Sequence, residues 1–138
     1  MRTVLILLAA AGLSPAIAAP VKMSIVLTGV AEVPGPGSIE GSGSADLNFD
    51  NEKAQVCYRL TSQGTDTPTM AHIHKGAVGV AGGVVVPLVA PAGGKSEGCA
   101  SVAADVLAAI LATPSDYYVN VHSAAFPKGA LRGQLGGR

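Results

Sequence analysis

Three histidines are the residues of this sequence best placed to do chemistry together. His72 and His74 stand two positions apart in the segment AHIH, His122 closes the segment DYYVNVH, and the chain has no other histidine. Neutral imidazole binds copper and zinc, and three ligands on one ion leave a position open, as a catalytic metal site requires. The three residues therefore predict a mononuclear transition-metal site, provided that the fold brings their rings together.

Both histidine segments have the alternating pattern of a β-strand. Residues at i and i+2 of a strand face the same side, so His72 and His74 share one face and the apolar residues of AHIH supply the core. In DYYVNVH the same alternation places His122 with Tyr118 and Asn120, away from the core. Side chains two apart lie about 6 to 7 Å from each other at Cβ, so both rings can reach one ion at roughly 2.0 Å.

Three further side chains are expected on the histidine face. Met70 falls there by the same alternation, and a thioether favours copper, above all Cu(I), over zinc. Asn120 and Gln134 are candidates to hydrogen-bond the imidazole N–H groups. The competing interpretation is that Met70 fills a strand edge and that the two amides are ordinary exposed polar residues.

Arg132 has two competing interpretations. If 116–122 and 130–135 form a hairpin, alternation turns Arg132 toward the histidine face and its leucine neighbours into the core. A cation there would draw a small anion such as superoxide to an open metal position, which makes Arg132 a candidate catalytic residue. Alternatively, Arg132 packs over Tyr118 or pairs with an acidic residue at the surface.

The elements that must position these residues are short strands. The chain has 18 glycines and 9 prolines, and the segments between them are rich in Val, Ile, Leu and Tyr, which favours an all-β sandwich or barrel. The Ala- and Leu-rich segment 102–112, which stops before Pro114, predicts one short connecting helix. Strands are predicted at 22–29, 42–49, 54–62, 69–74, 83–88, 96–101, 116–122 and 130–135.

The first residues have the form of a secretory signal peptide. Arg2 precedes an apolar run that is too short to cross a bilayer, and small residues follow it, so cleavage is expected after Ala18 or Ala19. We therefore expect a signal peptide at 1–19, one mature domain at 20–138, no membrane anchor, and a periplasmic or secreted protein.

Charge excludes some partners. The chain has nine basic and nine acidic residues, and removal of Arg2 with the signal peptide leaves eight basic residues and a formal charge of −1. Because these residues are scattered, the sequence has no electrostatic footprint for nucleic acid or an anionic membrane.

The two cysteines, Cys57 and Cys99, predict a disulfide. An even pair in an exported chain is normally oxidised. The alternative, thiolates serving as metal ligands, would require both residues to be reduced and close to the histidines.

Two long segments resemble the CHRD domain, which is named from chordin: AHIHKGAVGVAGGVVVPL (71–88) and PSDYYVNVHSAAFPKGALRGQL (114–135). The resemblance implies an immunoglobulin-like or superoxide-dismutase-like Greek-key β-sandwich over the mature chain. Chordin-type copies are usually regarded as binding modules, so the resemblance also implies an alternative function, namely non-catalytic binding of a protein or glycan. Activity itself has to be argued from the site.

A second likeness concerns the histidines. An H-x-H strand and a late histidine in a small exported β-sandwich with one disulfide resemble the copper half of copper-zinc superoxide dismutases. His72 and His74 then match the H-x-H ligands, and His122 matches the late one. The bridging and zinc-site histidines are missing, so the likeness implies a copper-only site with redox activity toward superoxide. Zinc, with a metal-bound hydroxide for hydrolytic chemistry, is the alternative.

Overall fold

The computed structural model describes residues 18–136, and they form an eight-stranded antiparallel sheet. The strand order is β5-β4-β7-β8-β1-β2-β3-β6. One α-helix, α1 (Ala104–Ala112), and two 3-10 turns, η1 (Gly29–Ala31) and η2 (Pro114–Asp116), complete the fold. The strands are β1 (Val21–Thr28), β2 (Ser42–Asp50), β3 (Gln55–Gln63), β4 (Pro68–Lys75), β5 (Val84–Leu88), β6 (Lys95–Ser101), β7 (Tyr117–Ser123) and β8 (Leu131–Gln134).

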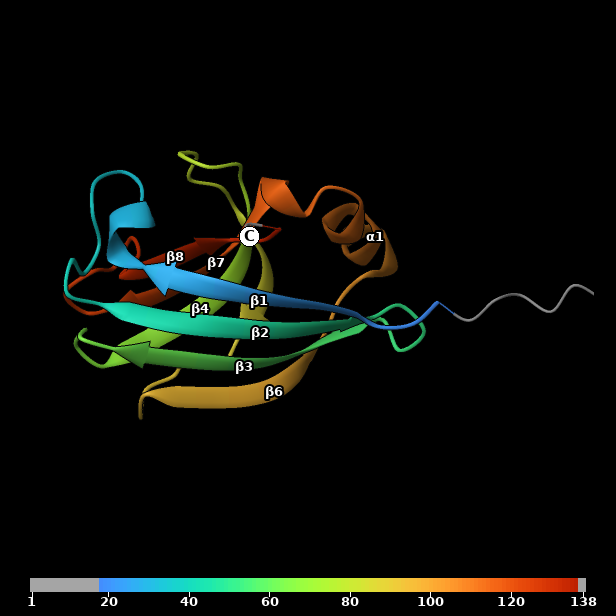
Figure 1. Cartoon of the computed structure of the whole chain (residues 1–138), viewed down its shortest axis with the longest axis horizontal. Coiled ribbons are helices and arrows are strands. Elements are labelled where there is room, and N and C mark those ends of the chain that lie inside the picture. The colour runs from blue at the N-terminus through green and yellow to red at the C-terminus, as the bar shows by residue number, and fades with distance from the viewer. Residues whose placement is uncertain (1–17, 137–138) are drawn as a thin grey trace, which may run out of the picture.

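The sheet folds over so far that it nearly closes into a barrel. In Figure 1, β1, β2, β3 and β6 lie side by side in front of β4, β7 and β8. The two halves are joined where Thr28 of β1 pairs with Arg132 of β8. The predicted all-β fold with one short helix is confirmed, and each predicted strand is present with bounds shifted by no more than two residues. The finer assignment, an immunoglobulin-like or superoxide-dismutase-like Greek-key sandwich, stays a prediction.

The core lies between the two halves and follows the alternation of the strands. Every second side chain is apolar, buried and directed inward from Ala45 to Phe49 in β2 and from Val56 to Leu60 in β3. Helix α1 closes one end of the core with Leu107 and Ile110, which lie three apart and therefore share a face. On the other half, the inward residues of the histidine-bearing strands are Ala71, Ile73, Tyr117, Val119 and Val121.

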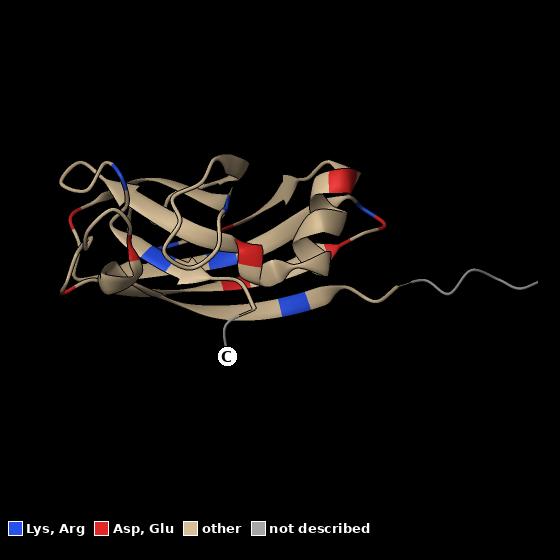
Figure 2. Ribbon diagram, turned by 90° about the horizontal axis from the view of Figure 1, so that it is seen from above, with Lys and Arg blue, Asp and Glu red and all other residues tan. Residues whose placement is uncertain are grey.

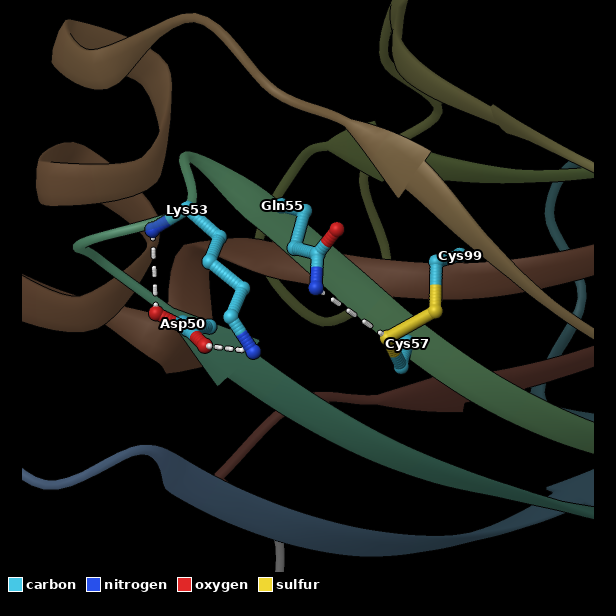
Figure 3. The surroundings of a disulfide bond; sticks show 5 residues. All are labelled: Asp50, Lys53, Gln55, Cys57 and Cys99. Carbon is cyan, nitrogen blue, oxygen red and sulfur yellow. Dashed lines mark hydrogen bonds and ion pairs between the residues drawn. A yellow bond between two sulfur atoms is a disulfide. The ribbon is translucent and has the colours of Figure 1, made fainter.

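The predicted disulfide is present and joins neighbouring strands. Cys57 of β3 lies directly opposite Cys99 of β6, and the two sulfurs are bonded. Figure 3 shows the pair beside Gln55, whose amide Nε2 lies 3.5 Å from the Cys57 sulfur. Because β6 is an end strand of the sheet, the disulfide fixes an element that has a strand neighbour on only one side.

Charged residues are dispersed over the described part of the chain. Figure 2 shows lysines and arginines interspersed with acidic residues and not gathered on one element. Within residues 18–136, no helix has the length and apolar character needed to cross a membrane. The predicted signal peptide at 1–19 falls almost wholly outside the described residues.

Candidate metal centre

Strands β4 and β7 bring the three histidines into one cluster. They pair antiparallel, with Met70 opposite His122 and His72 opposite Asn120, so that the three imidazoles project from the same face. The ring centroids are 5.1 Å apart for His72 and His122, 5.3 Å for His72 and His74, and 5.9 Å for His74 and His122. The expected convergence is confirmed. We call these three residues the histidine cluster.

Backbone carbonyls fix the tautomers of two of the imidazoles. The Nδ1 of His74 lies 2.9 Å from the carbonyl oxygen of Gly82, and the Nδ1 of His122 lies 3.1 Å from that of Pro127. A carbonyl oxygen only accepts, so Nδ1 must carry the proton in both rings. Each Nε2 therefore has a lone pair, which is the orientation that metal-binding histidines acquire from their outer hydrogen bonds.

The inward nitrogens of the histidine cluster lack partners within the described chain. Nδ1 of His72 and Nε2 of His74 and His122 are buried and make no hydrogen bond. One ligand atom from each ring lies within 4.8 Å of the others. Nitrogens on a tetrahedral ion at about 2.0 Å are about 3.3 Å apart, so small ring rotations suffice for binding. A buried polar atom without a partner costs about 1–3 kcal/mol, and an ion bound by the three nitrogens would remove this cost. The cluster therefore fits a metal ion.

The environment keeps the histidine cluster neutral. Burial, with the nearby His122 and His74 adding to it, lowers the pKa of His72 to about 4. Burial also lowers the pKa of His74 and His122, against the hydrogen bonds to their carbonyl partners. Neutral imidazoles are the form that binds a metal ion, so the site does not have to lose protons at neutral pH before it binds one.

Tyr118 and Arg132 support the cluster from the side. The Tyr118 ring stacks on His74 with centroids 4.9 Å apart and planes 7° from parallel. Arg132, on the strand at the other side of β7, places its guanidinium carbon 3.5 Å from the centre of the same ring. The stack holds His74 in one orientation, because both partners are buried and cannot rotate away.

The segment 76–83, which we call the 76–83 loop, covers this stack. Arg132 donates to the carbonyl oxygens of Val80 and Ala77 at 2.9 and 2.8 Å, and Gln134 donates to that of Gly76 at 2.7 Å. These bonds hold the loop over the site by its backbone.

Gly82 in the 76–83 loop makes hydrogen bonds to both His74 and Tyr118 through its backbone. Its carbonyl accepts from His74, and its N–H donates to the Tyr118 hydroxyl at 3.1 Å. A Cβ at this position would lie 1.5 Å from the carbonyl oxygen of Lys75. Only glycine fits this approach, and the loop could not hold His74 in the same way with any other residue there.

The structure confirms some of the expectations for the other side chains predicted near the histidines. Met70 lies on the histidine face and is 48% exposed. Arg132 packs over Tyr118, as one of its two interpretations required, and is 2% exposed; attraction of an anion stays a prediction. Asn120 and Gln134 were candidates to accept hydrogen bonds from imidazole N–H groups, but the N–H groups of His74 and His122 are directed at loop carbonyls instead. Asn120 is also not the exposed polar residue of the competing interpretation, since it is buried.

Sequence reasoning missed Glu32. This residue follows η1, is buried, and accepts a hydrogen bond from Nδ2 of Asn120, which also donates to the carbonyl oxygen of Leu131 at 3.3 Å. Burial raises the pKa of Glu32 to about 7, against the attraction of Arg132. A single acidic residue in a loop of Gly and Pro carries no sequence signal, because its partner lies 88 positions away.

Comparison with known protein families identifies the family of this chain. The CHRD domain profile matches residues 23–135, from within β1 to the end of β8, and this range includes the whole histidine cluster. Neither the curated proteins nor the solved structures contain a match to the chain. Since the profile covers most of the sequence, the chain belongs to the CHRD domain family.

Proposed function

We propose that this protein binds one copper ion through His72, His74 and His122 and leaves a coordination position open to a small ligand. The observation that carries the proposal is the convergence of three buried, unpartnered imidazole nitrogens, two of them with the tautomer that metal binding needs. Three neutral ligands leave the full charge of the ion in place, which favours an anion or water at the open position.

Copper is proposed ahead of zinc for two reasons. The H-x-H strand with a late histidine is the part of the site that resembles copper-zinc superoxide dismutases. Met70, opposite His122 in the ladder, places a thioether at the edge of the cluster, and sulfur ligands favour copper. The enzymatic form of the proposal is dismutation, in which two superoxide anions and two protons give O₂ and H₂O₂ as copper alternates between Cu(II) and Cu(I).

Export to the periplasm or the medium belongs to the same proposal. The disulfide of Cys57 and Cys99 supports it, because such bonds persist in oxidising compartments. The signal-peptide pattern at 1–19 points the same way.

The test is metal binding by untagged protein, because the chain has only three histidines and a tag would add others. Equimolar copper and zinc are offered, and elemental analysis with an electron paramagnetic resonance spectrum counts and identifies the bound ion. We expect one copper per chain in the wild type and none in His74→Ala. Lys75→Ala, an exposed neighbour on the same strand, is the matched control and should bind as the wild type does.

The outcomes separate the alternatives. Zinc in place of copper would move the proposal to a three-histidine zinc site, and no bound metal would end it. Copper bound at one per chain without consumption of superoxide would leave a copper carrier, not a dismutase.

A further inference from the structure

A fourth unpartnered atom lies on the face of the histidine cluster. Asn120 is 1% exposed, and its Oδ1 is buried with no hydrogen-bond partner among residues 18–136. Five buried side-chain atoms of the described chain lack a partner; three belong to the cluster, one is Asn120 Oδ1, and the fifth is Asn48 Oδ1 on β2. Four of the five therefore share one face of β4 and β7.

The hydrogen bonds of Asn120 determine where this oxygen points. Nδ2 donates to the carbonyl oxygen of Leu131 on β8 and to Glu32, and a carbonyl accepts only, so the nitrogen must be on that side. The two amide atoms lie about 120° apart around Cγ, so Oδ1 is directed away from β8. The strand on that other side is β4, where the ladder partner of Asn120 is His72.

We propose that Asn120 Oδ1 accepts a hydrogen bond from the small ligand, water in the resting protein, that completes the coordination of the ion in the histidine cluster. The inference rests on the proposed function and adds the chemical class of that ligand. A ligand with an O–H or N–H group satisfies the Asn120 oxygen. An anion without hydrogen, such as azide or superoxide, is still attracted by the charge of the ion but directs a lone pair at the Asn120 oxygen, so it binds less tightly than it would in a site without that oxygen.

Glu32 is the positioning residue in this arrangement. Its carboxyl accepts a hydrogen bond from Nδ2 of Asn120, which prevents the amide from rotating to present an N–H group to the ion. A direct bond from Asn120 Oδ1 to copper is the competing arrangement, and it is disfavoured because imidazole suits copper better than an amide oxygen does.

The experiment measures azide binding to the copper(II)-loaded full mature chain through the azide-to-copper absorption band. Asn120→Leu replaces the amide, and with it the acceptor, by an apolar group with the same number of heavy atoms and the same branching. Asn48→Leu is the matched control, because it removes the other unpartnered amide oxygen, on a strand that pairs with neither β4 nor β7. We expect Asn120→Leu to bind azide about five-fold to ten-fold more tightly than the wild type, and Asn48→Leu to match the wild type.

Copper content is measured before azide is added, and it separates the two proposals. A wild-type protein without copper overturns the proposed function and this inference with it. Copper at one per chain in every variant, with the same azide affinity in Asn120→Leu and the wild type, overturns the inference alone. Copper lost only in Asn120→Leu also overturns it, since the oxygen would then be a direct ligand.

Two further measurements keep the test decisive if Asn120→Leu does not fold. Asn120→Ala removes atoms without adding any and is expected to show the same gain in azide affinity. An electron–nuclear double resonance spectrum of the wild type needs no variant. Strongly coupled protons that vanish in D₂O are expected from a water molecule on the ion, and their absence overturns the inference.

Discussion

Replacing Glu32 by glutamine tests how burial of this carboxyl beside Asn120 affects stability. Burial raises the pKa of Glu32 from its ordinary value of 4.5 to about 7. Over that pH range the folded protein keeps a proton that the unfolded chain has released. The contribution of Glu32 to stability is therefore fully present below about pH 4.5 and is lost as the pH rises through about 7.

The size of the effect follows from the two pKa values. A carboxyl whose pKa rises from 4.5 to about 7 changes the free energy of unfolding by about 3 kcal/mol in total. Most of this change, about 2–3 kcal/mol, falls between about pH 5 and about pH 8. Glu32 is 6% exposed, so solvent screens it little.

The histidine cluster titrates in the same range with the opposite sign, because burial lowers the pKa values of its members. Both proteins share that contribution, and it cancels in their difference. The stability of Glu32→Gln relative to the wild type is therefore expected to rise by about 2–3 kcal/mol from about pH 5 to about pH 8.

Urea unfolding followed by circular dichroism, with a chelator present to remove metal, measures this difference. Glutamine keeps an oxygen that accepts from Asn120 Nδ2, so the variant tests the charge and not the hydrogen bond. A stability difference that is the same at both pH values would refute the reasoning.

Three other substitutions give separate predictions. Gly82→Ala should weaken copper binding about 10-fold to 100-fold by displacing the carbonyl that orients His74; unchanged affinity in a copper titration would contradict this. Replacing Cys57 and Cys99 together by serine should lower the free energy of unfolding by about 4 kcal/mol, because the bond closes a loop across 42 positions; a much smaller loss in urea unfolding would show that the unfolded chain is already restricted. Met70→Leu should weaken Cu(I) binding and leave Zn(II) binding unchanged, whereas Met23→Leu, the control, should alter neither.

The alternation of the two histidine strands was enough to predict which face of each strand carries the histidines. AHIH and DYYVNVH each have apolar residues at every second position, and burial of these residues leaves the histidines on one common face. Alternation does not determine which strands are neighbours. The structure shows that β4 pairs with β7, and this pairing brings the three histidines together.

The supports of the site could not be predicted in the same way. His74 and His122 are oriented by the carbonyl groups of Gly82 and Pro127, and every residue has a carbonyl, so side-chain type carries no signal. The position of Arg132 was predicted to the correct face. Its packing over Tyr118 was one of the two interpretations. Its hydrogen bonds to the 76–83 loop were not predicted, because the acceptors are backbone atoms more than 50 positions away.

The 76–83 loop is held to the domain through its own carbonyl oxygens, which accept hydrogen bonds from Arg132 and Gln134. Its side chains take no part in these bonds. Val78 and Val80 point their side chains into solvent, at 79% and 52% exposure, while the carbonyl of Val80 anchors the loop. Residues of other size or charge at these two positions would change the outer surface of the loop without breaking the backbone bonds that hold it and, through Gly82, orient His74. The surface of the loop can therefore vary independently of the histidine cluster that it supports.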